Sequence, residues 1–274
     1  MSLLGTLTSG VSALKTFSKS LEVIGNNIAN VNTTAYKGSS TNFADTFSNT
    51  LQAASTTDGA VQVGTGVQIA GINTNYTQGS LSSTGKSTDL AISGNGYFLV
   101  QDASGANYVS RDGSFHFDTN GDLLNSQNMA VLDSTGAKIV VSGKDAGGAT
   151  VPYTQLASVS IGSDGAVTAF ASDGTATSTQ QVGLMSIADE SKLMKVGQNM
   201  YDFGATGATV ATNLGVPGST GLGKIESGEL ELSNVDLTEQ FSDLITAQRS
   251  FQAASRLITV SDSVLDEIVN LKRS

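Results

Sequence analysis

Both ends of the chain carry a long apolar stripe with helical spacing, and this feature constrains the fold most. In the first 28 residues apolar side chains recur at Leu7, Val11, Leu14, Leu21 and Ile28, at steps of three and four if the small residues Ser18 and Gly25 are counted. The same spacing returns near the other end, at Leu237, Phe241, Leu244, Phe251, Ile258 and Leu265. Neither Gly nor Pro interrupts residues 237–274, and Asp236 with Glu239 is a typical helix start. The sequence therefore predicts a helix over residues 1–30 and another over residues 233–274.

Between these helices, strand and turn signals alternate quickly. The chain has 31 Gly and only 14% charged residues, a composition typical of turn-rich β structure. Asp102, Asp118 and Asp133 are each followed by Gly three residues later, so we expect tight turns in which Gly121 and its counterparts adopt a positive φ. We predict an α+β fold, with an Asn/Gly-rich connector over residues 31–70 and an irregular, mostly antiparallel β domain over residues 71–232.

The two predicted helices can bury their stripes in two ways. They can form a helical hairpin that packs on the sheet of the same chain. Alternatively, faces that remain uncovered require other subunits, because two long amphipathic helices cannot bury such stripes completely on each other. On the second interpretation, the eleven stripe residues named above lie at subunit interfaces.

Charge and composition exclude several classes of function. The net charge of −10 argues against a nucleic-acid partner, which would need clustered Lys and Arg. No apolar run reaches the roughly 18 residues of a membrane span, so we expect no insertion into lipid. The first residues lack the pattern of a secretory signal, and the absence of cysteine leaves the compartment open.

The sequence offers no catalytic residue, cofactor site or metal site. Its single histidine, His116, is predicted to point outward from a strand. Asp118, Asn120 and Asp122 resemble the first half of a calcium loop, but Leu123 and Met129 stand where that loop needs Gly and Glu. We therefore expect a protein that is not an enzyme.

Two long motifs carry a resemblance to a known family. Residues 21–47 read LEVIGNNIANVNTTAYKGSSTNFADTF, and residues 226–274 begin ESGELELSNVDLTEQF. The matching positions are Asn26, Asn27, Ala29, Asn30, Thr33, Tyr36, Lys37, Ser233, Asn234, Val235, Asp236, Gln248 and Arg249. With two further segments, at residues 76–100 and 108–124, the chain resembles the bacterial flagellar axial proteins, the rod and hook subunits, over nearly its whole length.

The resemblance implies a structural role in motility. In this family the terminal helices pair, coiled-coil fashion, and line the inner core of a helical tube, while β domains form its outer layer. Implied partners are further copies of the chain, other axial proteins (distal rod, hook cap and hook–filament junction) and the flagellar type III export apparatus. The expected location is the hook or basal body, outside the cell after export without a cleaved signal.

The ending favours the hook over the rod within this family. SNVDLTEQF, AQRSFQ and VNLKR are similar to hook proteins. The resemblance thus predicts a hook subunit, which transmits torque from rod to filament through a flexible tube. The alternative is a distal-rod subunit, because 274 residues leave no room for the additional outer domain of many hook proteins. A binding module such as an adhesin would keep the β domain but would not require matched terminal helices.

Overall fold

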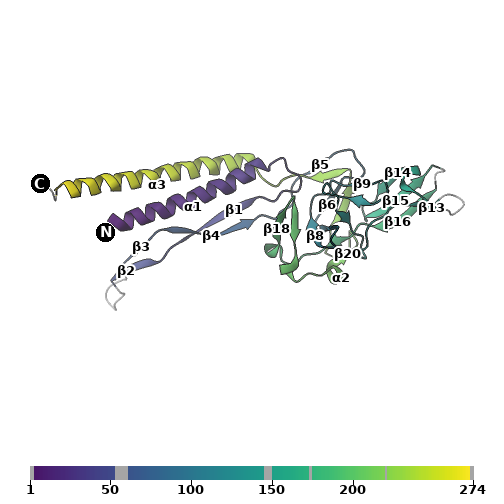
Figure 1. Cartoon of the computed structure of the whole chain (residues 1–274), viewed down its shortest axis with the longest axis horizontal. Coiled ribbons are helices and arrows are strands. Elements are labelled where there is room, and N and C mark those ends of the chain that lie inside the picture. Colours follow the sequence, from purple (N-terminus) through teal and green to yellow (C-terminus); the bar gives the residue numbers. More distant parts are fainter. Residues whose placement is uncertain (1–2, 53–60, 145–149, 173–174, 220, 272–274) are drawn as a thin grey trace. The chain divides into compact units, whose positions relative to one another are not determined.

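The computed structural model describes residues 3–52, 61–144, 150–172, 175–219 and 221–271. Backbone contacts divide the chain into two compact units. The helical unit comprises residues 1–31, 37–75 and 235–274, and the β unit comprises residues 32–36 and 76–234. Figure 1 follows the chain through both units and shows both termini at the helices.

The two predicted helices are confirmed. They are α1 (Leu3–Ala29) and α3 (Leu237–Leu271), and they run side by side in opposite directions (Figure 1). Asp236 caps α3, because its carboxylate accepts hydrogen bonds from the backbone amides of Thr238 (2.7 Å) and Glu239 (3.3 Å). These two amides hold the pKa of the Asp236 carboxyl below its usual value. At the end of α1, the Asn30 side chain donates to the carbonyl oxygen of Asn26 at 2.9 Å.

The segment interpreted as a connector contains four strands of the helical unit. Strand β1 (Ser39–Asp45) pairs with β4 (Val67–Thr74), and β2 (Ser48–Gln52) pairs with β3 (Val61–Gly64), all antiparallel. Strand β1 lies along α1, where the Thr41 hydroxyl donates to the Ser20 hydroxyl at 3.1 Å. The sequence does not reveal β1, because Ser39 and Thr41 on its α1-facing side are polar and Phe43 is its only large apolar residue.

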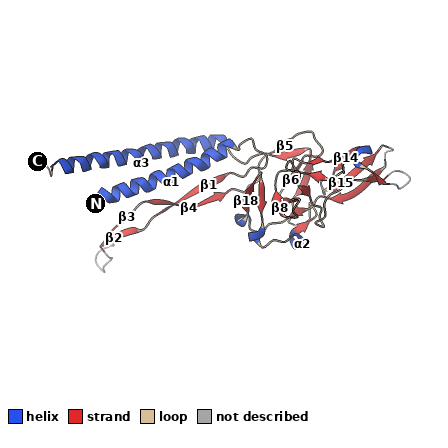
Figure 2. Ribbon diagram, in the orientation of Figure 1, coloured by secondary structure: helices blue, strands red, loops and turns tan. Residues whose placement is uncertain are grey.

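A nine-stranded antiparallel sheet dominates the β unit (Figure 2). Its path runs β18-β19-β8-β7-β11-β10-β9, and β17 pairs with both β7 and β20. The bounds are β7 (Tyr97–Gln101), β8 (Asn107–Ser110), β9 (His116–Phe117), β10 (Leu123–Leu124), β11 (Ala130–Val131), β17 (Leu184–Met185), β18 (Met194–Gly197), β19 (Met200–Asp202) and β20 (Leu214–Gly215).

Smaller ladders complete the β unit. A three-stranded sheet contains β14 (Leu156–Ile161), β15 (Ala166–Ala171) and β16 (Ala176–Gln181). The two-stranded pairs are β5 (Leu81–Ser83) with β22 (Glu229–Glu231), β6 (Leu90–Ser93) with β21 (Lys224–Ser227), and β12 (Gly143–Lys144) with β13 (Thr150–Val151). Short helical turns are α2 (Val210–Asn213) and the 3-10 segments Tyr153–Gln155, Glu190–Lys192 and Gly204–Thr206. The ladders of the described residues are antiparallel, which confirms the predicted α+β class.

Strand β7 is the centre of the β unit's core. Successive side chains of a strand point to opposite faces, and here both faces are covered. Phe98 and Val100 join a cluster that includes Leu90, Ile92, Leu123, Val131, Val167 and Ile225. Tyr97 and Leu99 join a second cluster with Val109, Leu132, Met185, Leu193 and Tyr201. The β unit therefore buries most of its large apolar side chains within itself, although Met194 and Val196 of β18 are exposed.

The three D-x-x-G turns form as predicted. Gly105, Gly121 and Gly136 have φ angles of 88°, 86° and 83°. In each turn the Gly amide donates to the Asp carbonyl oxygen three residues earlier, at 2.9, 2.9 and 3.0 Å. His116 is exposed on β9, as its position in the alternating pattern predicts.

Candidate functional site

One face of α1 packs on α3. Gly10 lies beside Ile258 and Leu257, so a side chain there would meet the side chains of both residues. Four predicted interface residues share this face with Gly10 by their spacing and are half-buried, namely Leu7, Leu14, Leu21 and Ile28. Most of the first predicted stripe, with the exception of exposed Val11, therefore shares the face of α1 that packs on the chain's own second helix.

The most deeply buried side chains on the face of α3 that packs on α1 are small. Ala247 and Ser261 are buried there, and the predicted interface residues Leu244, Ile258 and Leu265 are half-buried at matching spacing. The Ser261 hydroxyl donates to the carbonyl oxygen of Leu257 at 2.8 Å, which satisfies it within the helix. Because this face is narrow, it leaves most of α3's large apolar side chains outside the helix pair.

The remaining predicted interface residues are exposed, and they are Val11, Leu237, Phe241 and Phe251. Other large apolar side chains of α3 are exposed with them, among them Ile245, Leu257, Val260, Val264, Ile268, Val269 and Leu271. Phe241 is 51% exposed, Ile245 58% and Val260 61%. Ile245 and Val260 lie outside the predicted stripe, so sequence reasoning missed them. Exposure of so many large apolar side chains on one helix is typical of a surface that other molecules cover.

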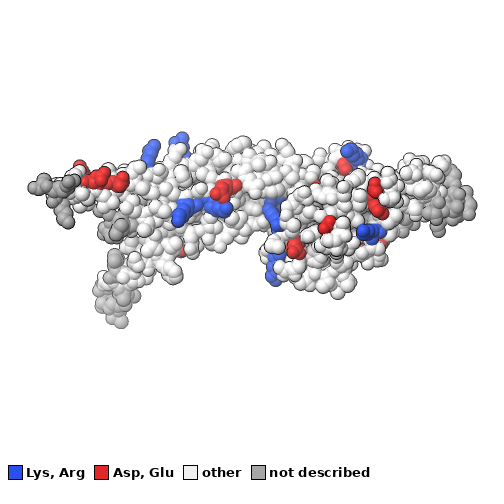
Figure 3. All heavy atoms as spheres, viewed as in Figure 1, with Lys and Arg blue, Asp and Glu red and all other residues white. Residues whose placement is uncertain are grey.

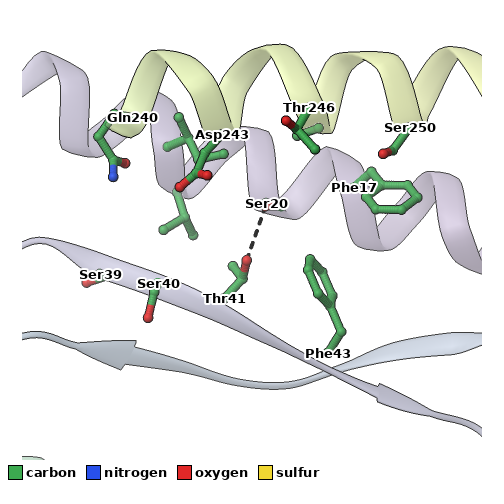
Figure 4. A pocket seen from close by; sticks show the side chains of 13 residues that line it. Phe17, Ser20, Ser39, Ser40, Thr41, Phe43, Gln240, Asp243, Thr246 and Ser250 are labelled. Carbon is green, nitrogen blue, oxygen red and sulfur yellow. Dashed lines mark hydrogen bonds between the residues drawn. The ribbon is translucent and has the colours of Figure 1, made fainter. Parts of the chain in front are cut away.

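A groove of about 280 Å³ lies between α1, α3 and β1 in the helical unit (Figure 4). Phe17 and Phe43 form its apolar end, with ring centroids 6.0 Å apart in a T-shaped arrangement. The rest of the lining mixes hydroxyl groups such as those of Ser20 and Thr41 and the Asp243 carboxylate with apolar side chains. Among the described residues that line this groove, Asp243 is the only ionisable one, so the lining does not form an acid–base pair or a catalytic triad.

The asparagine-rich motif after α1 has a structural role in both units. The Asn27 side chain donates to the Ser39 carbonyl oxygen (2.8 Å) and to Gln240 Oε1 (2.8 Å), and it accepts from the Ser39 amide (3.0 Å). Buried Asn27 thus joins α1, β1 and α3. Within the β unit, the Asn234 amide donates to the Tyr36 carbonyl oxygen at 3.3 Å.

The other motif residues occupy varied positions. Asn30, Thr33, Tyr36, Ser233 and Val235 are half-buried, and Lys37 is buried. Asn26, Ala29, Asp236, Gln248 and Arg249 are exposed. Burial raises the pKa of the Tyr36 hydroxyl, and Lys195 Nζ lies 5.2 Å from the centre of its ring.

A buried ion pair in the β unit connects strand ends. Arg111 Nη1 lies 3.5 Å from Glu231 Oε2, and both side chains are almost fully buried. The Gly79 amide donates to Glu231 Oε1 at 2.9 Å, and the Arg111 guanidinium stacks 5.0 Å from the centre of the Tyr97 ring. These contacts fix the segments after β8 and around β22.

No group of three or more His, Cys, Asp or Glu side chains among the described residues could hold a metal ion. No described helix is long and apolar enough to cross a membrane.

Comparison with known proteins matches the chain in three places. The family model described as flagellar hook protein FlgE/F/G D1 domain matches residues 91–169. The model described as flagellar basal body rod FlgEFG protein C-terminal matches residues 226–271, and that described as flagella basal body rod protein matches residues 7–37.

Relatives match over the full length. The flagellar basal-body rod protein FlgG of Bacillus subtilis is 40% identical over 277 aligned positions, which cover 99% of this chain and 100% of the relative. The protein of the same name from Borreliella burgdorferi is 31% identical, covering 100% of this chain and 99% of the relative. The flagellar hook protein FlgE of Brucella suis is 26% identical over 406 positions, with full coverage of both chains.

The protein is thus a structural subunit of the bacterial flagellum. It belongs to the family of flagellar axial proteins that build the rod and hook, and this family assembles from many copies of its own subunits together with other flagellar components.

Proposed function

We propose that this protein is a distal-rod subunit of the flagellar basal body. The observation that carries the proposal is the full-length similarity of 40% to a protein named as a basal-body rod protein. Similarity to hook proteins is lower, at 26%, and its alignment of 406 positions exceeds the 274 residues of this chain. The hook relatives therefore carry long insertions that this chain lacks.

The hook interpretation from the sequence rests on shorter features. The ending SNVDLTEQF contributes a helix cap at Asp236, whose function is the same in any member of the family with this helix. A local cap does not determine whether the assembled tube is flexible or stiff. We therefore prefer the rod over the hook, and we propose no catalytic role.

The proposed mechanism is burial of the exposed faces of α3 between copies. Burying one large apolar side chain contributes about 1.5–3 kcal/mol. Val11, Leu237, Phe241 and Phe251 are the predicted interface residues that remain available for such contacts. Contacts between two different surfaces that do not close into a ring generate an open helical filament.

A rod also requires stiffness, and the strands along α1 support this role. Strand β1 is attached to α1 at three points along its length, through Asn27–Ser39, Ser20–Thr41 and Phe17–Phe43. A strand bonded to the helix at intervals resists bending of that helix more than a loose connector would. We further propose export through the flagellar type III apparatus, as the resemblance implies.

Electron microscopy of basal bodies from a strain lacking this gene tests the proposal. We expect a rod that is cut short and carries no hook. Complementation with the intact gene should restore both structures. A complete rod without a hook would contradict the rod assignment and favour the hook.

A further inference from the structure

The third face of α1 is open within the helical unit. Its exposed residues recur at steps of three and four, at Thr8, Val11, Lys15, Ser18, Glu22 and Gly25. Thr8, Ser18 and Gly25 are small, so another helix could approach closely beside them. A shallow apolar groove of about 350 Å³, lined by α1 residues including Leu7, Val11 and Lys15, opens near its start. We call Val11, Lys15, Ser18 and Glu22 the α1 strip.

The C-terminal half of α3 presents a complementary exposed strip. Its apolar members are Leu257, Val260, Val264 and Ile268, and the first three lie between a base, Arg256, and an acid, Glu267. We call Arg256, Val260, Val264 and Glu267 the α3 strip. Figure 3 shows the charges on the drawn face as small groups on a mostly uncharged surface, and opposite charges of this kind influence the register of a contact.

We propose that the α1 strip of one copy docks antiparallel on the α3 strip of a second copy. The inference rests on the proposed self-assembling function and names the contact that carries it. Antiparallel pairing puts Lys15 beside Glu267 and Glu22 beside Arg256, while Val260 and Val264 pack over Ser18. The two charges are seven residues apart on α1 and eleven on α3, a mismatch of about 6 Å. The long Lys and Arg side chains span such a difference.

One existing contact bears on this pairing. Lys19 Nζ lies 2.6 Å from Glu22 Oε2, and both side chains are exposed. An exposed pair of this kind contributes little, so Glu22 can accept Arg256 of a second copy while it keeps Lys19.

The same pairing is impossible within one chain. Gly10 lies beside Ile258, and Asn27 bonds Gln240, so Lys15 lies level with about residue 253. Glu267 is 14 residues further along α3, a distance of about 21 Å. The second copy must therefore be displaced by about that distance along the helix axis. The α1 strip and the α3 strip are different surfaces, so a copy uses only one of them in each contact. Its other strip remains for a further copy, and the contact repeats as an open series.

Charge exchange in the full-length protein tests the register. Lys15→Glu and Glu267→Lys should each raise the critical concentration for assembly about threefold to tenfold, since each replaces an attraction by a repulsion. The double variant Lys15→Glu/Glu267→Lys should restore assembly toward the wild-type value. As a control, Lys138→Glu/Glu267→Lys has the same net charge but places the new acid on the β unit, and it should not restore assembly. A double variant no better than either single variant would overturn the proposal.

Disulfide trapping provides a second, independent measurement, because the chain has no cysteine of its own. Ser18→Cys/Val264→Cys should give a ladder of cross-linked oligomers on mild oxidation of assembled protein. Ser18→Cys/Thr259→Cys, in which the second thiol lies on another face of α3, should remain mostly monomeric. Equal cross-linking of both pairs, or none in the first, would overturn the proposed register. Wild-type protein that never assembles would instead contradict the self-assembling function itself, and the contact with it.

Discussion

The two units differ in where their large apolar side chains lie. In the β unit, Tyr97, Phe98, Leu99 and Val100 are almost completely buried, so strand β7 has no face left to cover. In the helical unit, α3 keeps Phe241 and Leu271 exposed, the latter at 74%. The β unit buries most of its large apolar side chains within one chain, with exceptions such as Met194, whereas the helical unit leaves a larger set of them exposed along α3. From this difference we infer that the β unit provides most of the stability of the monomer and that the helical unit provides the surface for assembly.

The buried polar groups of the two units also differ in what they hold together. The β unit encloses the Arg111–Glu231 pair, and breaking one member would leave a buried charge without its partner. The helical unit joins its elements through Asn27, whose bonds hold one end of α1 to β1 and α3. A polar anchor at one end fixes the orientation of the helices while their apolar faces stay available.

We expect the largest difference in unfolding free energy between substitutions of two phenylalanines, one in each unit. Phe98→Ala should lower the free energy of unfolding of the β unit by about 3–5 kcal/mol, because it opens a cavity in a closed core. The matched variant Phe241→Ala should change monomer stability by no more than about 0.5 kcal/mol, since its side chain is exposed. Urea unfolding of dilute monomer measures both. Similar losses in the two variants would mean that the helical unit is as complete as the β unit.

Assembly should respond in the opposite order. Phe241→Asp should raise the critical concentration for polymerisation roughly tenfold to a hundredfold, the equivalent of losing about 1.5–3 kcal/mol of burial per subunit. Sedimentation of assembled protein measures it, and the circular dichroism of the monomer should not change. Phe47→Asp, at another exposed aromatic of the helical unit, shows whether the effect is specific to α3. Normal polymerisation of Phe241→Asp would exclude this face from the subunit contact.

The sequence predicts local features of the fold better than features that depend on residues far apart in the chain, for a physical reason. Helix spacing, the Asp236 cap and the D-x-x-G turns depend on residues close together in the chain, and the structure confirms all three. Strand β1 was not recognised because polar Ser39 and Thr41 face α1, and the pairing with β4 joins residues far apart in sequence. The stripe residues were identified, but their periodicity alone cannot tell which half packs within the chain. That depends on where small residues such as Gly10 and Ala247 let the helices meet.

We expect a smaller difference in stability between substitutions of two glycines, one in each unit. Gly121→Val should destabilise the β unit by about 1–3 kcal/mol, because Gly121 has φ 86° and a Cβ there would overlap the Val141 carbonyl oxygen. Gly25→Ala should instead stabilise α1 by about 0.5–1 kcal/mol, since nothing lies within contact of a Cβ at that exposed helical position. Thermal unfolding of each monomer measures the pair. A neutral Gly121→Val would remove the assigned turn.

The last prediction concerns the ionisation of buried tyrosines. We expect it to leave the stability of the β unit unchanged at neutral pH and to lower it only in alkali. Burial, with the nearby Glu190 carboxylate, raises the pKa of Tyr97, and burial raises that of Tyr201. Both folded-state pKa values exceed the ordinary value of about 10, so their contribution to stability is complete below pH ~10 and is lost as the pH rises further.

All six tyrosines lie in the β unit, so absorbance at 295 nm reports on that unit alone, while circular dichroism at 222 nm follows mainly the helices. We expect Tyr97 and Tyr201 to ionise only as the β unit unfolds, and Tyr97→Phe to make that unit less sensitive to alkali. Ionisation of all six tyrosines near pH 10 with the β unit still folded would show that its core admits water, and the contrast between a closed unit and an open one would fail.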